Sequence, residues 1–155
     1  MKVYANDDFC DFYWEELPPE KMNEDRLKRR IDFYAGRGGV SAIFFNLNAS
    51  RAFFDSSSRT PIWEGLEDDG SYRGILQSRM LINLARNCRA LFRNVADPIG
   101  FQYQYCHQCG VDMWLSMRMN DVHHIDRPQL LMHDDFWRDR PDRCRAPWRG
   151  DDWNA

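Results

Sequence analysis

Three short apolar runs, separated by stretches with helical spacing, constrain the fold of this chain most. The runs cover residues 2–6, 40–46 and 111–119. Between them, apolar residues recur at intervals of three and four, which is typical of helices packed by one face. Strands that alternate with helices in this way favour βαβ units and a parallel sheet. We therefore predict an α/β fold, with three parallel strands side by side in sequence order and helices on one face.

The helices have recognisable start and stop residues. Asn23 can cap a helix whose apolar face carries Leu27 and Ile31. A second helical pattern runs over residues 80–95. The pair Asp97-Pro98 then predicts a third helix start, because Asp caps a helix and Pro suits its first position.

Length limits how much of an α/β architecture the chain can form. It has 155 residues, whereas a closed (β/α)8 barrel usually takes about 250. We expect one domain over residues 1–155, an incomplete barrel that is truncated at its carboxyl end. Residues 49–73 read as a long irregular loop, a feature that is often functional, and residues 121–155 have no clear periodicity.

The composition of the chain argues against two classes of partner, nucleic acids and membranes. The formal charge is −3, so no nucleic-acid partner is expected, and the Arg-rich tract 138–149 is balanced by aspartates. No apolar stretch is long enough for a membrane span, and the first residues lack the pattern of a signal peptide. The five cysteines are odd in number and irregularly spaced, which favours a reduced, cytoplasmic protein.

Polar residues follow each predicted strand. Ligands of parallel α/β folds bind at the carboxyl ends of the strands, so these residues are the candidate binding site. They are Asp7 and Asp8 after the first strand, Asn46 and Asn48 at the second, and Arg118, Asn120, Asp121 and His123 at the third.

The third strand predicts which side of the sheet faces a ligand. Side chains alternate between faces, so Met113, Leu115, Met117 and Met119 share an apolar face that should pack on helices. The opposite face carries Trp114, Ser116, Arg118 and Asn120. A buried Arg needs an anionic or carbonyl partner. Arg118 therefore either contacts a ligand or forms an ion pair with Asp7 or Asp8 that ties strands together.

The stretch Trp114-Leu115-Ser116-Met117-Arg118-Met119-Asn120-Asp121-Val122-His123, followed by Asp135-Phe136-Trp137-Arg138, resembles a bacterial family of glycoside hydrolase-like TIM barrels. The Asn-Asp-Asp after the first strand is similar as well. The resemblance covers nearly the whole chain, which corresponds to the amino-terminal part of the family's barrel. It implies a carbohydrate ligand, and a further strand with acidic residues beyond Ala155.

Glycoside hydrolysis usually needs two carboxyl groups that flank the scissile bond. We expect the main catalytic carboxylates beyond Ala155, and helper roles for Asp7, Asp8 and Asp121. The 155-residue chain alone is therefore expected to be inactive. The alternatives are a non-catalytic sugar-binding or structural protein on the same barrel and, less favoured, a metal-dependent hydrolase.

No metal or other cofactor is expected. Seven possible ligands cluster in the sequence, but without an HxH or HExxH pattern: Asp121, His123, His124, Asp126, His133, Asp134 and Asp135. The CxxC formed by Cys106 and Cys109 lacks a second ligand pair, so we interpret both as packing residues. The oligomeric state, the sugar and the stereochemistry of hydrolysis stay open.

Overall fold

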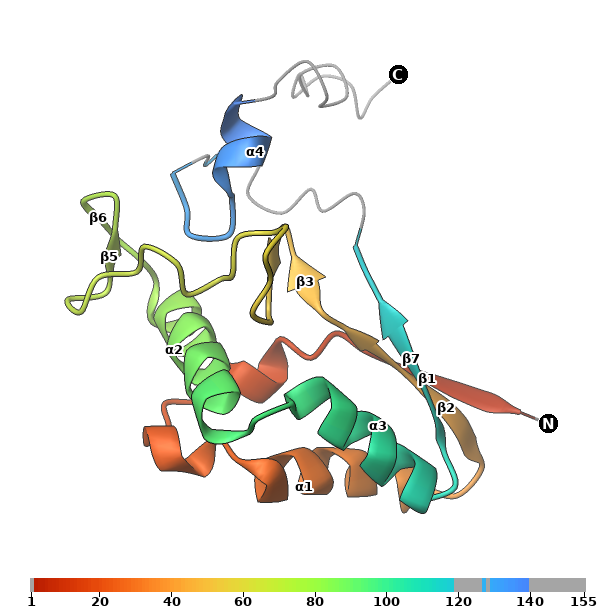
Figure 1. The fold of residues 1–155 in the computed structure, drawn as a ribbon. Helices are drawn as coiled ribbons and strands as arrows, with labels where there is room; N and C mark the ends of the chain where they lie inside the picture. Colours follow the sequence, from red (N-terminus) through yellow and green to blue (C-terminus); the bar gives the residue numbers. More distant parts are fainter. Residues whose placement is uncertain (1, 119–126, 128, 140–155) are drawn as a thin grey trace, which may run out of the picture.

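The computed structural model describes residues 2–118, 127 and 129–139, and it has a mixed α/β fold (Figure 1). The three predicted strands are β1 (Val3–Asp7), β2 (Val40–Asn46) and β7 (Asp112–Ser116). They form one parallel sheet in the order β1-β2-β7, which confirms the predicted order and direction. The main helices are α1 (Glu24–Ala35), α2 (Arg79–Asn94) and α3 (Pro98–Gln108).

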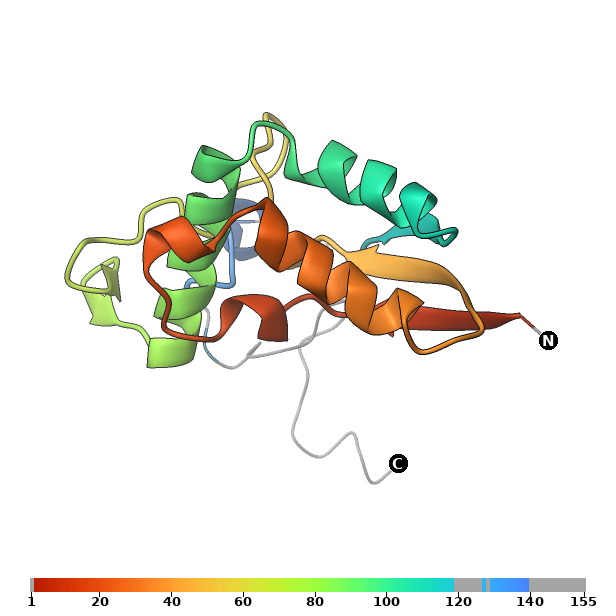
Figure 2. The ribbon, with the colours of Figure 1, turned by 90° about the horizontal axis from the view of Figure 1, so that it is seen from below.

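The two predicted cap residues, Asn23 and Asp97, begin α1 and α3. The Asn23 side chain accepts a hydrogen bond from the backbone N–H of Arg26 at 3.1 Å, and Asp97 accepts one from Gly100 at 2.9 Å. Ser78 caps α2 in the same way. Each cap satisfies a backbone donor that the helix itself leaves open. α1 and α3 then lie side by side against one face of the sheet (Figure 2).

The main hydrophobic core fills the space between that face and the helices. Ile43 and Phe45 of β2 are fully buried in it, together with Leu27 and Ile31 of α1. The segment after β1 adds three aromatic rings to this core, which stack or meet edge to face. They belong to Phe9 and to Phe12 and Tyr13 of the 3-10 helix η1 (Asp11–Tyr13). A second 3-10 helix, η2 (Pro19–Lys21), leads into α1.

Two small hairpins lie in and next to residues 49–73, the segment predicted as an irregular loop. β3 (Asn48–Ala49) pairs with β4 (Arg51–Ala52), and β5 (Ser71–Tyr72) pairs with β6 (Ile75–Leu76), both antiparallel. Strands of two residues are too short to show an alternation of apolar and polar residues, so no sequence pattern predicted them. The short helix α4 (Asp135–Asp139) also lies where no periodicity was visible.

The third strand is shorter than predicted, since it ends at Ser116 rather than at residue 119. Its register sets Met113 beside Ile43 and Leu115 beside Phe45, so the methionine–leucine face is the helix-covered one, as expected. Met113 packs against the core, but Leu115 and Met117 are each 52% exposed. α3 therefore covers only the start of β7. Met119 lies outside the described residues.

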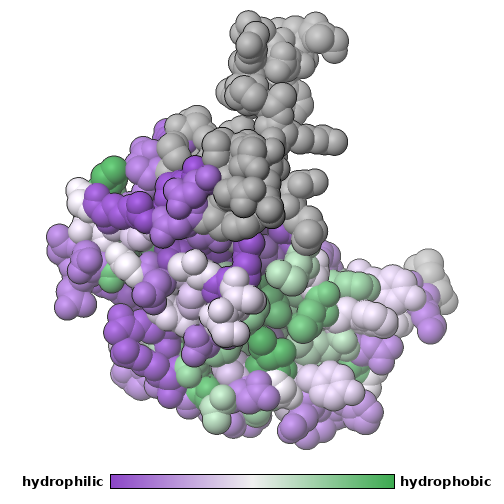
Figure 3. Space-filling model, turned by 45° about the horizontal axis from the view of Figure 1, so that its top comes forward, coloured by the Kyte–Doolittle hydropathy of each residue, from purple (hydrophilic) through white to green (hydrophobic). Residues whose placement is uncertain are grey.

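The other face of the sheet carries no helix among the described elements. Trp114 and Phe44 lie next to each other on it, with ring centroids 6.1 Å apart and nearly parallel planes. Tyr4 of β1 meets Phe44 edge to face at 6.2 Å. Tyr4 and Trp114 are 60% and 58% exposed. Figure 3 shows hydrophobic surface gathered over the strands.

None of the helices in the described part of the chain is both long and apolar enough to cross a bilayer.

Candidate functional site

The carboxyl end of the sheet brings together Asp8, Asn48 and Arg118, three of the predicted site residues. Arg118 follows β7, and its guanidinium is 2.6 Å from the carboxylate of Asp8, which follows β1. The side chains are 27% and 57% exposed, so this ion pair is solvated and contributes little to stability. It spans the sheet end from one outer strand to the other. This contact is the strand-tying ion pair that the sequence offered as one role of Arg118.

Asn48 fixes the backbone of Arg118. Its side-chain nitrogen donates to the carbonyl of Arg118 at 3.0 Å, and its side-chain oxygen accepts from the backbone N–H of Arg118 at 2.8 Å. The amide thus takes the place of a neighbouring strand's peptide group, after the regular pairing of β2 and β7 has ended at Ser116. Asn48 is therefore a positioning residue for Arg118.

Asn46 has no such partner. It is 2% exposed, at the last position of β2, and its side-chain oxygen is buried without a hydrogen bond from any described residue. In register it lies beside Ser116, on the same helix-free face as Phe44 and Trp114. An unmet hydrogen bond on a buried amide costs roughly 1–3 kcal/mol. A polar ligand at this sheet end would remove that cost.

Asp7 lies on the opposite, helix-covered side. It is 1% exposed, and Arg30 of α1 donates to both of its oxygens, at 2.7 and 2.6 Å. Arg30 also donates to Asp11. Burial alone would lower the pKa of Arg30, but the hydrogen bonds to Asp7 and Asp11 outweigh it and raise that pKa. Asp7 joins β1 to α1, and the structure does not bring it to the other site residues.

Asn120, Asp121 and His123 lie outside the described residues, as do His124 and Asp126 of the possible metal cluster. Over the ranges that the structure describes, no three His, Cys, Asp or Glu side chains are arranged to hold a metal ion. Cys106 is buried and Cys109 partly buried at the end of α3. Burial raises the pKa of the Cys106 thiol to about 11, which favours the neutral, unreactive form.

Sequence reasoning missed two groups of residues. Tyr4 and Phe44 extend the aromatic surface of Trp114 along the helix-free face, and their alternation with inward-facing neighbours was the signal for it. The other group lines a cavity that contains Arg51, Tyr72 and Asp134. Arg51 and Tyr72 belong to the segment expected to be a loop, and only its length indicated a function.

Taken together, the sheet end offers a surface for a polar ligand with apolar faces. Asp8 and Arg118 supply an acceptor and donors at the rim, Asn46 supplies an unsatisfied side-chain oxygen close by, and aromatic rings lie on the adjoining face. No protein-family model matches this chain, and no characterised protein matches its sequence.

Proposed function

We propose that this chain binds carbohydrate at the carboxyl ends of β1, β2 and β7. One observation carries the proposal: the buried side-chain oxygen of Asn46, at the strand end, has no hydrogen-bond partner among the described residues. A sugar hydroxyl both donates and accepts, so it can satisfy an amide oxygen and nitrogen together. Ligands of parallel α/β folds bind at this edge.

The neighbouring aromatic residues support a sugar over a smaller polar ligand. Sugars have apolar C–H faces, which pack on flat rings such as Trp114 and Phe44. Hydroxyls at the rim would then bond to Asp8 and Arg118. The exposed rings of Tyr4 and Trp114, with the partly buried Phe44, lie beside a polar strand end and offer both kinds of contact at once.

We further propose that the three strands belong to a glycoside hydrolase-like (β/α)8 barrel, whose other strands would lie across from the aromatic face and leave the strand ends open to the sugar. The parallel strands in sequence order and the helices on one side support it. In such a barrel these residues would bind and orient the sugar, because the carboxylate of Asp8 is paired with Arg118 and that of Asp7 with Arg30. The hydrolytic pair would come from other strands.

Asp8 also favours a second candidate, a sugar-binding protein without catalysis. Its carboxylate forms an ion pair with Arg118, which holds it at the strand end where it can accept hydrogen bonds from sugar hydroxyls. Both candidates predict that the 155-residue chain binds sugar without hydrolysing it. Turnover of aryl glycosides by this chain would contradict both and would show that its own carboxylates are catalytic.

The binding test uses Asn46→Leu, because Leu has nearly the shape of Asn without its polar atoms. We expect the free energy of unfolding of this variant, measured with urea, to be about 1 kcal/mol higher than that of the wild type, since the substitution removes a buried unsatisfied oxygen. We also expect at least tenfold weaker binding of neutral oligosaccharides, measured by NMR titration. Gln104→Ala, an exposed amide on α3, is the control. A destabilised variant that binds sugar as well as the wild type would assign Asn46 a structural role.

A further inference from the structure

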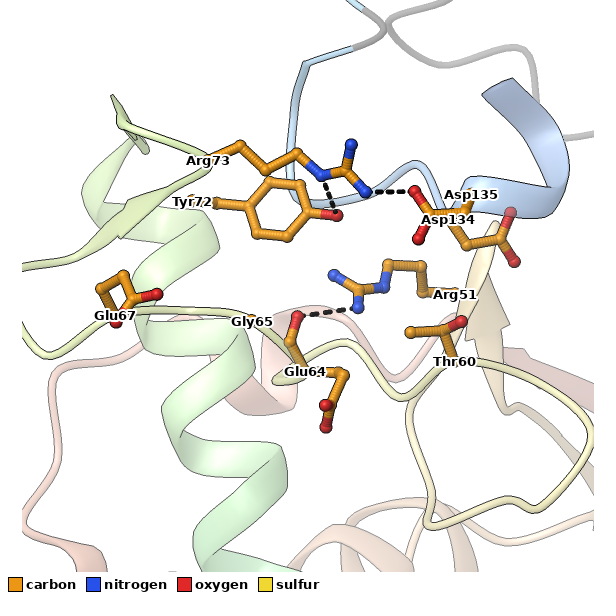
Figure 4. Close-up of a pocket in the computed structure, with 9 residues that line it drawn as sticks. All are labelled: Arg51, Thr60, Glu64, Gly65, Glu67, Tyr72, Arg73, Asp134 and Asp135. Carbon is orange, nitrogen blue, oxygen red and sulfur yellow. Dashed lines mark hydrogen bonds and ion pairs between the residues drawn. The ribbon is translucent and has the colours of Figure 1, made fainter. Parts of the chain in front are cut away.

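A cavity separate from the sheet-end site lies among the two small hairpins and the start of α4. Its volume is about 290 Å³, and it shares no lining residue with the sheet-end site. Figure 4 shows its lining, which comes from three parts of the chain: Arg51, Thr60, Glu64, Gly65, Glu67, Tyr72, Arg73, Asp134 and Asp135. Pockets for drug-sized ligands begin at about 300 Å³, so this one has room for a single small molecule.

Arg51 is the most buried cation of this cavity, with 1% of its surface exposed. Its guanidinium donates to the carbonyls of Leu131 at 3.0 Å and Glu64 at 2.8 Å. An Arg carries five N–H donors, so three of them have no acceptor in the described part of the chain. Its Nε is buried without any partner there.

Arg51 also lacks a carboxylate within salt-bridge distance among the described residues. The neighbouring arginines differ from it, because Arg59 contacts Asp134, and both Arg73 and Arg138 contact Asp135. Burial lowers the pKa of Arg51, which means that its surroundings disfavour the charged form. A buried charge is costly unless it is paired.

The rest of the lining completes a small binding site. The guanidinium of Arg51 points between the Tyr72 ring and the Glu64–Gly65 segment, and the carboxylate of Glu64 is directed away from it (Figure 4). The Arg51 guanidinium carbon is 5.4 Å from the centre of the Tyr72 ring. The hydroxyl of Tyr72 accepts hydrogen bonds from Arg73 at 3.2 Å and Arg138 at 3.0 Å, which hold the ring in place.

We propose that this cavity binds the carboxylate group of a small ligand through Arg51. The planar fork of a guanidinium matches a carboxylate, which would engage donors that are now unmatched. The side chains of Glu64 and Glu67 are solvent-exposed on the lining, so they disfavour a doubly charged phosphate more than a single negative charge. The Tyr72 ring would contact the body of the ligand.

Two sources could supply this carboxylate: a simple organic acid, or the acid group of a uronic acid. The test titrates the ¹⁵N-labelled 155-residue chain with sodium propionate, sodium glucuronate, glucose and phosphate at constant ionic strength. We expect a carboxylate to shift the Arg51 Nε–H signal and the amide signals around Tyr72. Glucuronate binding at least tenfold tighter than propionate assigns a uronic acid, whereas equal binding assigns a simple acid.

The Arg51→Gln variant should bind the carboxylate at least tenfold more weakly. Arg79→Gln, which removes an arginine paired with Glu16 on the surface, should bind as the wild type does. If Arg51→Gln does not fold, the shift of the Arg51 Nε–H signal in the wild type, on addition of a carboxylate, tests the proposal instead. Glucose binding as tightly as glucuronate, phosphate binding tighter than both acids, or no shift at Arg51 would each overturn the proposal. Asn46→Leu should leave carboxylate binding unchanged. The carboxylate proposal and the sheet-end proposal can therefore fail independently of each other.

Discussion

Asn48 and Arg118, 70 positions apart in the sequence, form a closed pair of hydrogen bonds between a side-chain amide and a backbone peptide. The pair continues the contact of β2 with β7 past Ser116, where regular pairing ends. Because the Arg118 backbone is fixed, its guanidinium reaches Asp8 on the far side of β2. The geometry of the sheet end thus depends on one buried amide.

Replacing Asn48 with Ala should lower the free energy of unfolding by about 2 kcal/mol, because both hydrogen bonds are lost and the two Arg118 backbone groups are left without these partners. Urea unfolding measures the change. Gln104→Ala, which removes an exposed amide on α3, should change it by less than about 0.5 kcal/mol. Equal effects of the two variants would show that the hydrogen bonds between Asn48 and Arg118 contribute nothing to stability.

Asp7 and Asp8 are adjacent in sequence but differ in role, and paired variants can show this. Asp7→Asn should destabilise the fold by about 3 kcal/mol, because it leaves Arg30 partly buried beside a neutral side chain. Asp8→Asn should cost less than about 1 kcal/mol, because its ion pair with Arg118 is solvated. Chemical denaturation of both variants gives the comparison, and similar losses would contradict the assigned roles.

The order and direction of the strands could be predicted because, in parallel α/β folds, they follow from the alternation of apolar runs with helical spacing along the chain. Residues 40–46 form an apolar run that is covered on one face by helices and flanked by two strands, and such runs are easily recognised. The site was predicted only in part. The first strand was predicted to end at residue 6, so Asp7 and Asp8 both followed it in sequence. In the structure Asp7 is the last residue of β1, and its side chain points toward Arg30, away from Asp8.

The cavity around Arg51 could not be predicted, for a different reason. Its residues come from positions 51–73 and 134–135, and hairpins of two residues per strand bring them together. No periodicity encodes such contacts, which depend on tight turns. The backbone at Ser50 and Arg73 has φ values of 63° and 53°, which neither residue type signals.

Stability should fall at alkaline pH, partly through Cys106. Burial raises the pKa of this thiol from about 9 to about 11 in the folded state. The unfolded chain therefore ionises first, so the stabilisation is complete below pH 9 and is lost as the pH rises toward 11. The full loss is at most roughly 2–3 kcal/mol.

Cys106→Ala tests this contribution, since it removes the titrating group. Urea unfolding at pH 8 and at pH 10.5 should show a smaller alkaline loss for the variant than for the wild type. Cys88 and Tyr13, whose pKa values are also raised by burial, titrate in both proteins and cancel in the comparison. Parallel losses in the two proteins would assign the alkaline effect to these other groups.

Ser50 turns the β3–β4 hairpin in the left-handed region, at φ 63°. This conformation costs a residue with a side chain about 1–2 kcal/mol, whereas glycine adopts it freely. Ser50→Gly should therefore raise the free energy of unfolding by about 1 kcal/mol. The hydrogen bond that Arg59 donates to the Ser50 carbonyl involves only the backbone of residue 50, so the variant keeps it.

Arg73→Gly is the informative contrast. Arg73 also has a positive φ, but its side chain bonds to Tyr72 and Asp135, so that variant should gain nothing or lose stability. Thermal unfolding of both variants measures the difference. A destabilised Ser50→Gly protein would mean that the Ser50 side chain makes a contact worth more than the backbone strain.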